Sequence, residues 1–233
     1  MIGDAFGALL GEAAATGAAT EVVERDDGFV SRGDAGRYLQ GPEFWAAHEV
    51  ALLERARGRI LDIGCGAGRH MAALRDRGAD VRGIDPSPGA VAVCRARGLT
   101  AEVGDIEALP AGPFDTLLLM GGNLALLGSP AAAARRLSAM AAVAGPDAVV
   151  LGSNIDPYHS PDPAHAGYHR RNRALGRPGG QLRVRVRNGD LVTEWMDYWL
   201  ASVAELETVL ATSPWRAERV EGGPFYSVVL VRR

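Results

Sequence analysis

The sequence predicts an α/β fold whose sheet is mostly parallel, has about seven strands with an antiparallel edge, and carries helices on both faces. Between Arg59 and Asn154, short apolar runs alternate with Ala- and Leu-rich helical segments. Strand, helix and strand in succession require right-handed crossovers, and therefore a parallel sheet. Two later runs, Trp215 to Val220 and Tyr226 to Arg232, predict closing antiparallel strands. This order of elements predicts a Rossmann-like fold.

Length and composition limit the class of protein. A chain of 233 residues is long enough for one well-buried domain. We expect this domain over residues 59–233, preceded in the sequence by a lid and first helices over residues 1–58. The net charge of −3 gives no general attraction to nucleic acid or to an anionic membrane. The two cysteines predict neither a disulfide framework nor a zinc site. Without a signal peptide or the ~18 apolar residues of a membrane span, we expect a cytoplasmic protein.

The N-terminal segment is expected to form a helical lid. Asp4 to Ala19 is rich in Ala, Gly and Leu, which favours a helix, whereas Glu21 to Arg37 is charged and interrupted by glycines. Pro42 to Arg57 has the apolar spacing of one amphipathic helix, with Phe44 and Trp45 among its apolar positions.

The first strand, from Arg59, ends in Asp62 and leads through a G-x-G-x-G turn into a helix. Glycines tolerate positive φ and let the backbone approach a ligand over the strand end. A dinucleotide fingerprint would need its third glycine at Arg69, and a P-loop needs a lysine, which this chain lacks. Asp62 favours a ligand with a cationic amino group and no phosphate. S-adenosylmethionine has an ammonium, a sulfonium and no phosphate.

The stretch from Ile60 to His70 resembles the first motif of the class I S-adenosylmethionine-dependent methyltransferases. Three later stretches lie where that family has its other motifs: Val81 to Pro88, Ala101 to Ile106, and Phe114 to Asn123. The resemblance covers residues 59–153 closely and implies S-adenosylmethionine as the cofactor. The lysine-free, Ala- and Arg-rich composition is typical of a GC-rich bacterial source.

The resemblance also implies which residues contact the cofactor. Asp85, at the end of the second strand, would accept hydrogen bonds from the ribose hydroxyls, and Asp105 would accept from the adenine amino group. Asn123 would lie beside the transferable methyl. Because the N-terminal segment of similar enzymes covers the cofactor, Tyr38 and Trp45 either contact it or pack the lid onto the sheet. The expected cofactor-binding residues are Asp62, Gly64, Cys65, Gly66, Gly68, Asp85, Pro86, Gly104, Asp105, Ile106, Met120 and Tyr38.

Three helix starts are predicted from capping signals, at Ser87-Pro88, at Ser129-Pro130, and at the capping box of Ser202 with Glu205. Gly145 is expected to end the second of these helices, and Ala148 to Gly152 to form the fifth strand.

A substrate-side insert is expected over residues 154–200. Asn154 to Gly180 is too long for a simple connection. Gln181 to Arg187 alternates apolar residues with arginines, and Leu191 to Leu200 is a second apolar run. Asn188-Gly189 between these two runs predicts a β-hairpin.

Methyl transfer needs little from the protein, because a methyl group on a sulfonium is already activated toward nucleophiles. The nucleophile must lie in line at roughly 3 Å, and a base is needed only where it carries a proton. His159 follows the fifth strand closely, and it acts as the base, hydrogen-bonds to the substrate, or lies in a solvated loop. The expected catalytic residues are His159, Tyr158 and Asn123.

Two other features of the insert have competing interpretations. His165 and His169 share one helix face near Asp162 and could hold a metal, but a solvated helix is favoured and no metal is expected. The arginines between Arg170 and Arg187 either bind an anionic substrate or RNA, or protect an exposed sheet edge. With few aromatic residues nearby for base stacking, edge protection is favoured.

The leading functional hypothesis is methyl transfer to an O or N atom of a small organic molecule, because a lid and a long insert suit a closed pocket. The alternatives are an RNA or protein methyltransferase, and a non-catalytic module that binds S-adenosylmethionine. A nicotinamide oxidoreductase is disfavoured by the positions of the glycines. We expect a small-molecule acceptor and neither a nucleic acid nor a membrane as partner.

Overall fold

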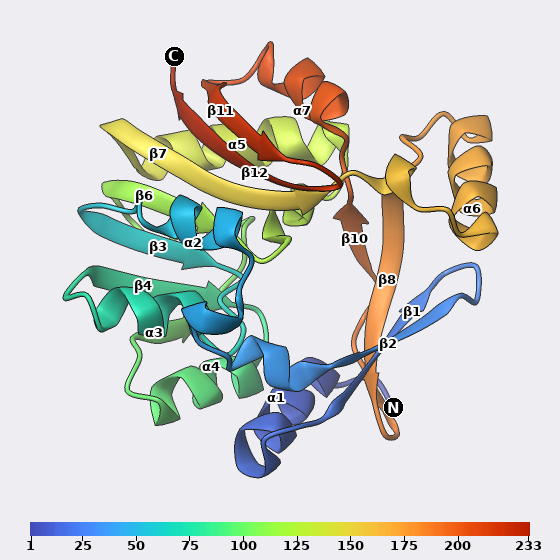
Figure 1. Cartoon of the computed structure of the whole chain (residues 1–233), viewed down its shortest axis with the longest axis horizontal. Coiled ribbons are helices and arrows are strands. Elements are labelled where there is room, and N and C mark those ends of the chain that lie inside the picture. The colour runs from blue at the N-terminus through green and yellow to red at the C-terminus, as the bar shows by residue number, and fades with distance from the viewer.

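A computed structural model describes all residues, 1–233. Its main sheet has seven strands in the order β11-β12-β7-β6-β3-β4-β5 (Figure 1). Only β12 runs antiparallel to its neighbours, and this confirms the predicted fold class. The strands are β3 (Arg59–Ile63), β4 (Asp80–Asp85), β5 (Ala101–Val103), β6 (Phe114–Leu119), β7 (Ala144–Ile155), β11 (Trp215–Gly222) and β12 (Phe225–Arg232).

Helices cover both faces of this sheet. On one face lie α2 (Ala47–Leu53) and α3 (Arg69–Arg75), with α4 (Pro88–Ala96) beside α3. On the other face lie the 3-10 helix η3 (Asn123–Leu127), α5 (Pro130–Val143) and α7 (Val203–Leu210). None of the helices has both the length and the apolar content needed to cross a bilayer.

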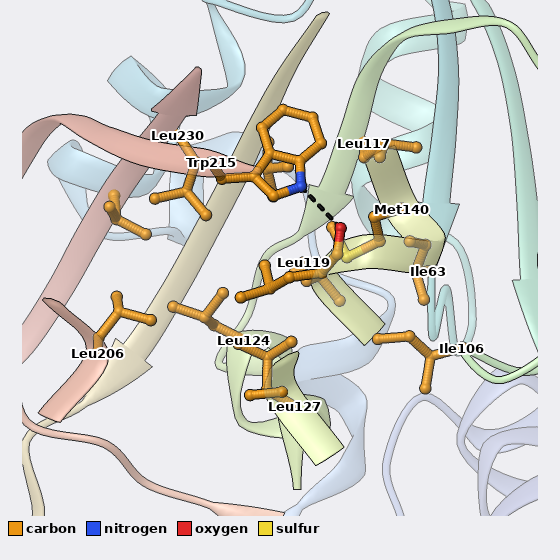
Figure 2. Close-up of a cluster of buried hydrophobic side chains, with 14 of the residues drawn as sticks. Ile63, Ile106, Leu117, Leu119, Leu124, Leu127, Met140, Leu206, Trp215 and Leu230 are labelled. Atoms are coloured by element: carbon orange, nitrogen blue, oxygen red, sulfur yellow. Dashed lines mark hydrogen bonds between the residues drawn. The ribbon is translucent and has the colours of Figure 1, made fainter. Parts of the chain in front are cut away.

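The largest core cluster lies between the sheet and α5 and α7 (Figure 2). Leu117 and Leu119 point into it, whereas Leu118 between them packs in the cluster on the opposite face, as the two-residue period of a strand requires. The buried Trp215 ring donates a hydrogen bond from Nε1 to the Leu137 carbonyl at 2.8 Å. This bond joins β11 to α5 and satisfies the polar atom of the indole.

The predicted helix starts are confirmed. Ser87 and Ser129 accept hydrogen bonds from backbone N–H groups of α4 and α5, and both bonds of the Ser202–Glu205 capping box are present. The helix predicted over Pro42 to Arg57 is wrong in one respect. It is broken into a 3-10 turn η2 (Pro42–Phe44) and α2, because Trp45 is extended and its indole donates to the Gln40 carbonyl at 3.0 Å.

A second sheet, in the order β10-β8-β1-β2 with β9 beside β8, stands against the carboxyl ends of the main sheet's strands (Figure 1). It joins the N-terminal segment to the insert, since β1 pairs antiparallel with β8. The lid is therefore not only helical, and the charged segment after α1 (Ala5–Thr16) forms a β-hairpin. The strands are β1 (Thr20–Arg25), β2 (Val30–Asp34), β8 (Gln181–Asn188), β9 (Leu191–Val192) and β10 (Met196–Trp199).

The predicted hairpin of the insert is present, with its turn one residue later than expected. Asn188 pairs with Leu191, so Gly189 and Asp190 form the two-residue turn, and Gly189 has the positive φ of +55° that such a turn requires. The longer segment before the hairpin folds into a 3-10 turn η4 (Pro157–His159) and α6 (Pro163–Ala174).

Candidate active site

The candidate site lies at the topological switch point of the main sheet. From β3 the chain proceeds outward to β4 and β5, and then returns to β6 on the other side of β3. Ligands of open α/β sheets bind at the carboxyl ends of the strands at such a point. Figure 1 shows the ends of β3 and β4 pointing toward the second sheet.

The glycine turn after β3 is shaped for close approach of a ligand. Gly64, Gly66 and Gly68 have positive φ values of +73°, +54° and +75°. A Cβ atom at Gly64 would lie 2.7 Å from Leu126, whereas a Cβ at Gly66 would meet nothing nearer than Phe6 at 3.9 Å. Gly64 is therefore required by packing, and Gly66 leaves its outer side open to a ligand.

Asp62 is a buried carboxylate without a full set of partners. Its side chain is 2 % exposed, and Oδ2 is one of three buried side-chain polar atoms with no hydrogen bond. Burial raises the pKa of Asp62, while the nearby His70 and Arg69 partly oppose that shift. A cationic group of a ligand could supply the partner that this buried carboxylate oxygen lacks.

Asp85 lies beside the turn and holds its shape. One carboxylate oxygen accepts from the Gly66 N–H at 2.8 Å, and the other accepts from the Ser87 N–H at 2.9 Å. Burial raises the pKa of Asp85 to about 6, although these two N–H groups lower it. Each oxygen keeps a second lone pair, which could accept from a diol. Cys65, between the glycines, is buried against Cys94, with 3.9 Å between their sulfurs.

The residues predicted at the adenine end differ in exposure. Asp105 is exposed and accepts from the Glu107 N–H at 2.8 Å, whereas Ile106 is buried in the core cluster. Gly104 donates its N–H to the Asp85 carbonyl, which fixes this loop beside Asp85. Pro86 is exposed.

The end of β6 is tied to the glycine turn. The Asn123 amide donates to the Gly64 carbonyl at 2.7 Å and to the Ile63 carbonyl at 3.2 Å, so this side chain holds the switch point together. Met120 is buried. The turn between them, Gly121-Gly122, has positive φ at both residues, and a Cβ at Gly121 would lie 2.8 Å from the Arg69 guanidinium.

A polar cluster joins α2 to α3 beside this turn. Glu49 accepts hydrogen bonds from Arg69 at 2.7 Å and lies 3.0 Å from Nε2 of His70. Trp45 packs edge-on against His70, with 4.9 Å between ring centroids. Trp45 thus packs the lid onto α3, the second of its two predicted roles.

The insert residues predicted to be catalytic lie on the side of α7. The Tyr158 hydroxyl donates to Glu205, at 2.5 Å, and His159 is 57 % exposed with Asp156 3.6 Å from its Nδ1. Neither side chain hydrogen-bonds to the glycine turn or to the end of β6. Their catalytic roles stay predictions. His165 lies 2.9 Å from the Arg25 guanidinium, which a metal ion at that nitrogen would have to displace.

Two further side chains that no sequence motif marks belong to the region around the site. The Tyr198 hydroxyl on β10 donates to the Gly122 carbonyl at 2.9 Å. Tyr38, predicted near the cofactor, donates to Glu21 at 2.7 Å and packs edge-on against Phe6 at 5.6 Å. Nothing in the local sequence marks Tyr198 or Glu21, because the second sheet that brings them here pairs strands far apart in the chain.

Comparison with known proteins agrees with this geometry. Residues 60–147 match the profile of a family described as a methyltransferase domain. The solved structure of a SAM-dependent methyltransferase from Bacteroides fragilis, in complex with S-adenosyl-L-homocysteine, superimposes with a TM-score of 0.83. It covers 98 % of this chain and 94 % of its own at 23 % identity, which shows a shared fold.

Two curated relatives match over shorter stretches. The release factor glutamine methyltransferase of Rhodospirillum rubrum is 48 % identical over 79 residues, 30 % of this chain and 24 % of its own. The trans-aconitate 2-methyltransferase of Methylobacterium nodulans is 31 % identical over 140 residues, 57 % of this chain and 52 % of its own. The matches thus span from about a quarter to about half of these relatives' own length.

The strand order, the glycine turn and the family match together define an α/β methyltransferase domain. The family match covers residues 60–147, and the whole chain has the fold of a SAM-dependent methyltransferase.

Proposed function

We propose that this protein transfers a methyl group from S-adenosylmethionine to an O or N atom of a small organic molecule. The observation that carries the proposal is the partnerless carboxylate oxygen of Asp62, buried at the switch point of a methyltransferase fold. The cofactor's ammonium would supply the partner that this oxygen lacks.

The residues present fit this cofactor. When bound, S-adenosylmethionine supplies a methyl group activated by a positively charged sulfur. Asp62 would hold the ammonium, the free lone pairs of Asp85 would accept from the ribose hydroxyls, and Asp105 would accept from the adenine amino group. The open side of Gly66 would let the backbone approach the ligand. Asn123 would keep β6 and the glycine turn at a fixed separation.

A small acceptor is supported by what covers the end of β6. Tyr198 of the second sheet contacts the Gly122 carbonyl, and Phe6 of α1 lies next to Gly66. An acceptor would therefore be enclosed by the N-terminal segment and the insert together. We propose a division of the chain at residue 58 into a lid and a methyltransferase domain. Strand β1 lies before this division and pairs with β8 after it.

No observation favours RNA as the acceptor. Arg185 and Arg187 are paired with Glu24 at 2.7 Å and 2.6 Å, which leaves less positive charge for phosphates. The release factor enzyme matches this chain over only 79 residues and says nothing about the acceptor side of this protein.

An acceptor screen tests the proposal. The purified protein is incubated with S-adenosylmethionine and a panel of small alcohols, phenols, amines and carboxylates, and with total RNA, and S-adenosylhomocysteine release is measured. We expect release that depends on at least one small O- or N-acceptor. Release with RNA alone, or cofactor binding without release for any acceptor, would contradict the proposal.

His159→Ala is expected to leave S-adenosylhomocysteine affinity within about threefold, because His159 is exposed and its nearest charged partner is Asp156. Turnover with the acceptor found in the screen should fall by much less than the ~100-fold typical of losing a general base, since the exposed imidazole is placed at most to position the acceptor. Steady-state kinetics check this. A fall of 100-fold or more would instead identify His159 as the base that accepts the proton of the acceptor.

A further inference from the structure

Three side chains of the N-terminal segment form a polar cluster around one buried carboxylate beside the candidate site. Glu21, on β1, is 5 % exposed. One of its carboxylate oxygens accepts from the Tyr38 hydroxyl at 2.7 Å, and the other accepts from the Arg37 guanidinium. Arg37 also donates to the Tyr38 hydroxyl at 3.0 Å, so the three groups fix one another. A buried carboxylate held in this way costs free energy to maintain, which points to a use.

The position of this cluster follows from its neighbours. Tyr38 packs against Phe6, and Phe6 is the side chain closest to the open side of Gly66. On the other side, Tyr198 of β10 lies on the same face of the second sheet as Glu21, since β1 and β10 both pair with β8. Tyr198 in turn contacts Gly122 at the end of β6. The cluster therefore lies beside the glycine turn, on the face of the second sheet that also carries Tyr198.

We propose that Glu21, held by Tyr38 and Arg37, is the carboxylate that faces the transferable methyl group, and that the acceptor is a small molecule whose amino or hydroxyl group donates a hydrogen bond to it. This inference rests on the proposed function. The proposed function places the methyl group at the end of β6. Glu21 is a buried acid that is not among the residues assigned to the cofactor.

The step balances without another reactant. As the acceptor's O or N lone pair bonds to the methyl carbon, the carbon–sulfur bond breaks and its electron pair remains on sulfur. The proton of the acceptor passes to the Glu21 carboxylate, directly or through the Tyr38 hydroxyl, and then leaves to solvent.

The test uses two cofactor analogues and needs no acceptor. Sinefungin carries an amino group at the place of the transferable methyl, whereas S-adenosylhomocysteine has nothing there. Affinities of both are measured by calorimetry for wild type and Glu21→Gln, which keeps the shape of the side chain and removes its charge. We expect sinefungin binding to weaken by roughly 10- to 100-fold, as loss of a charge-assisted hydrogen bond would give, and S-adenosylhomocysteine binding to stay within about threefold.

Glu24→Gln is the matched control. Glu24 lies on the same strand but on its other face, where Arg185 and Arg187 hold it. Both affinities should be unchanged in this variant. If Glu21→Gln weakens both ligands by the same factor, Glu21 only supports the fold, and if it weakens neither, it does not face the methyl; either result overturns the inference. If neither ligand binds wild type, the proposed function itself is wrong.

Discussion

Asp62→Asn is expected to bind S-adenosylhomocysteine at least about 100-fold more weakly than wild type, and to unfold at a higher temperature. The first effect follows because the variant keeps the shape of Asp62 but cannot form an ion pair with the ligand's ammonium, and breaking a buried pair costs about 3 kcal/mol or more. The second follows because the free protein no longer buries a carboxylate whose Oδ2 has no partner. Effects of opposite sign mark a residue kept for binding and not for stability.

The measurements are calorimetric titration and thermal unfolding without ligand. If removal of the buried charge raises the free energy of unfolding by about 1 kcal/mol, the melting temperature should rise by roughly 2–4 °C for a chain of this size. Asp80→Asn is the control, since Asp80 is exposed at the opposite, amino end of β4 and should change neither quantity. Unchanged affinity in Asp62→Asn would remove Asp62 from the site.

Asp85→Ala is expected to weaken S-adenosylhomocysteine binding by about 1.5–3 kcal/mol, or roughly 10- to 150-fold. The variant loses the acceptor for the ribose hydroxyls, and it also frees the Gly66 and Ser87 N–H groups that Asp85 holds. Asp105→Ala should do less, because Asp105 is exposed and its hydrogen bonds compete with water. Equal affinities in wild type and Asp85→Ala would contradict the assignment.

The pH dependence of binding gives a second measurement on Asp85. Its pKa of about 6 lies above the unfolded value of about 3.9, so the free protein binds a proton that the unfolded chain does not over this range. This contribution to stability is present at low pH and is lost as pH rises through about 6. Ligand affinity should change in the opposite direction, rising by up to about tenfold per pH unit below pH 6 as the acceptor ionises. Asp85→Ala should reduce this dependence.

Most of the main sheet was predictable because its signals are local. The glycine turn, the N-caps at Ser87 and Ser129 and the capping box at Ser202 each lie within a few residues of the element they define. The second sheet was not predictable in this way. Pairing of Val23 with Val186 depends on tertiary contacts and leaves only a charged, glycine-interrupted pattern in the sequence of β1 and β2.

The same distinction holds for the site. Asp62 and Asp85 end strands that the sequence identifies, and the structure places both beside the glycine turn. Glu21 and Tyr198 belong to the second sheet, whose strand pairing no local sequence signal marks, and the catalytic role of His159 stays a prediction. The segment that follows β7 turns toward α7, where the Tyr158 hydroxyl donates a hydrogen bond to Glu205.

The most direct test of the central claim is a thermal unfolding measurement of the wild-type protein with S-adenosylhomocysteine and, separately, with NAD. At about 100 times its dissociation constant, a bound ligand stabilises by roughly 2.7 kcal/mol, which corresponds to a rise of roughly 5–11 °C. We predict this rise with S-adenosylhomocysteine and none with NAD. A rise with NAD and none with S-adenosylhomocysteine would contradict the account.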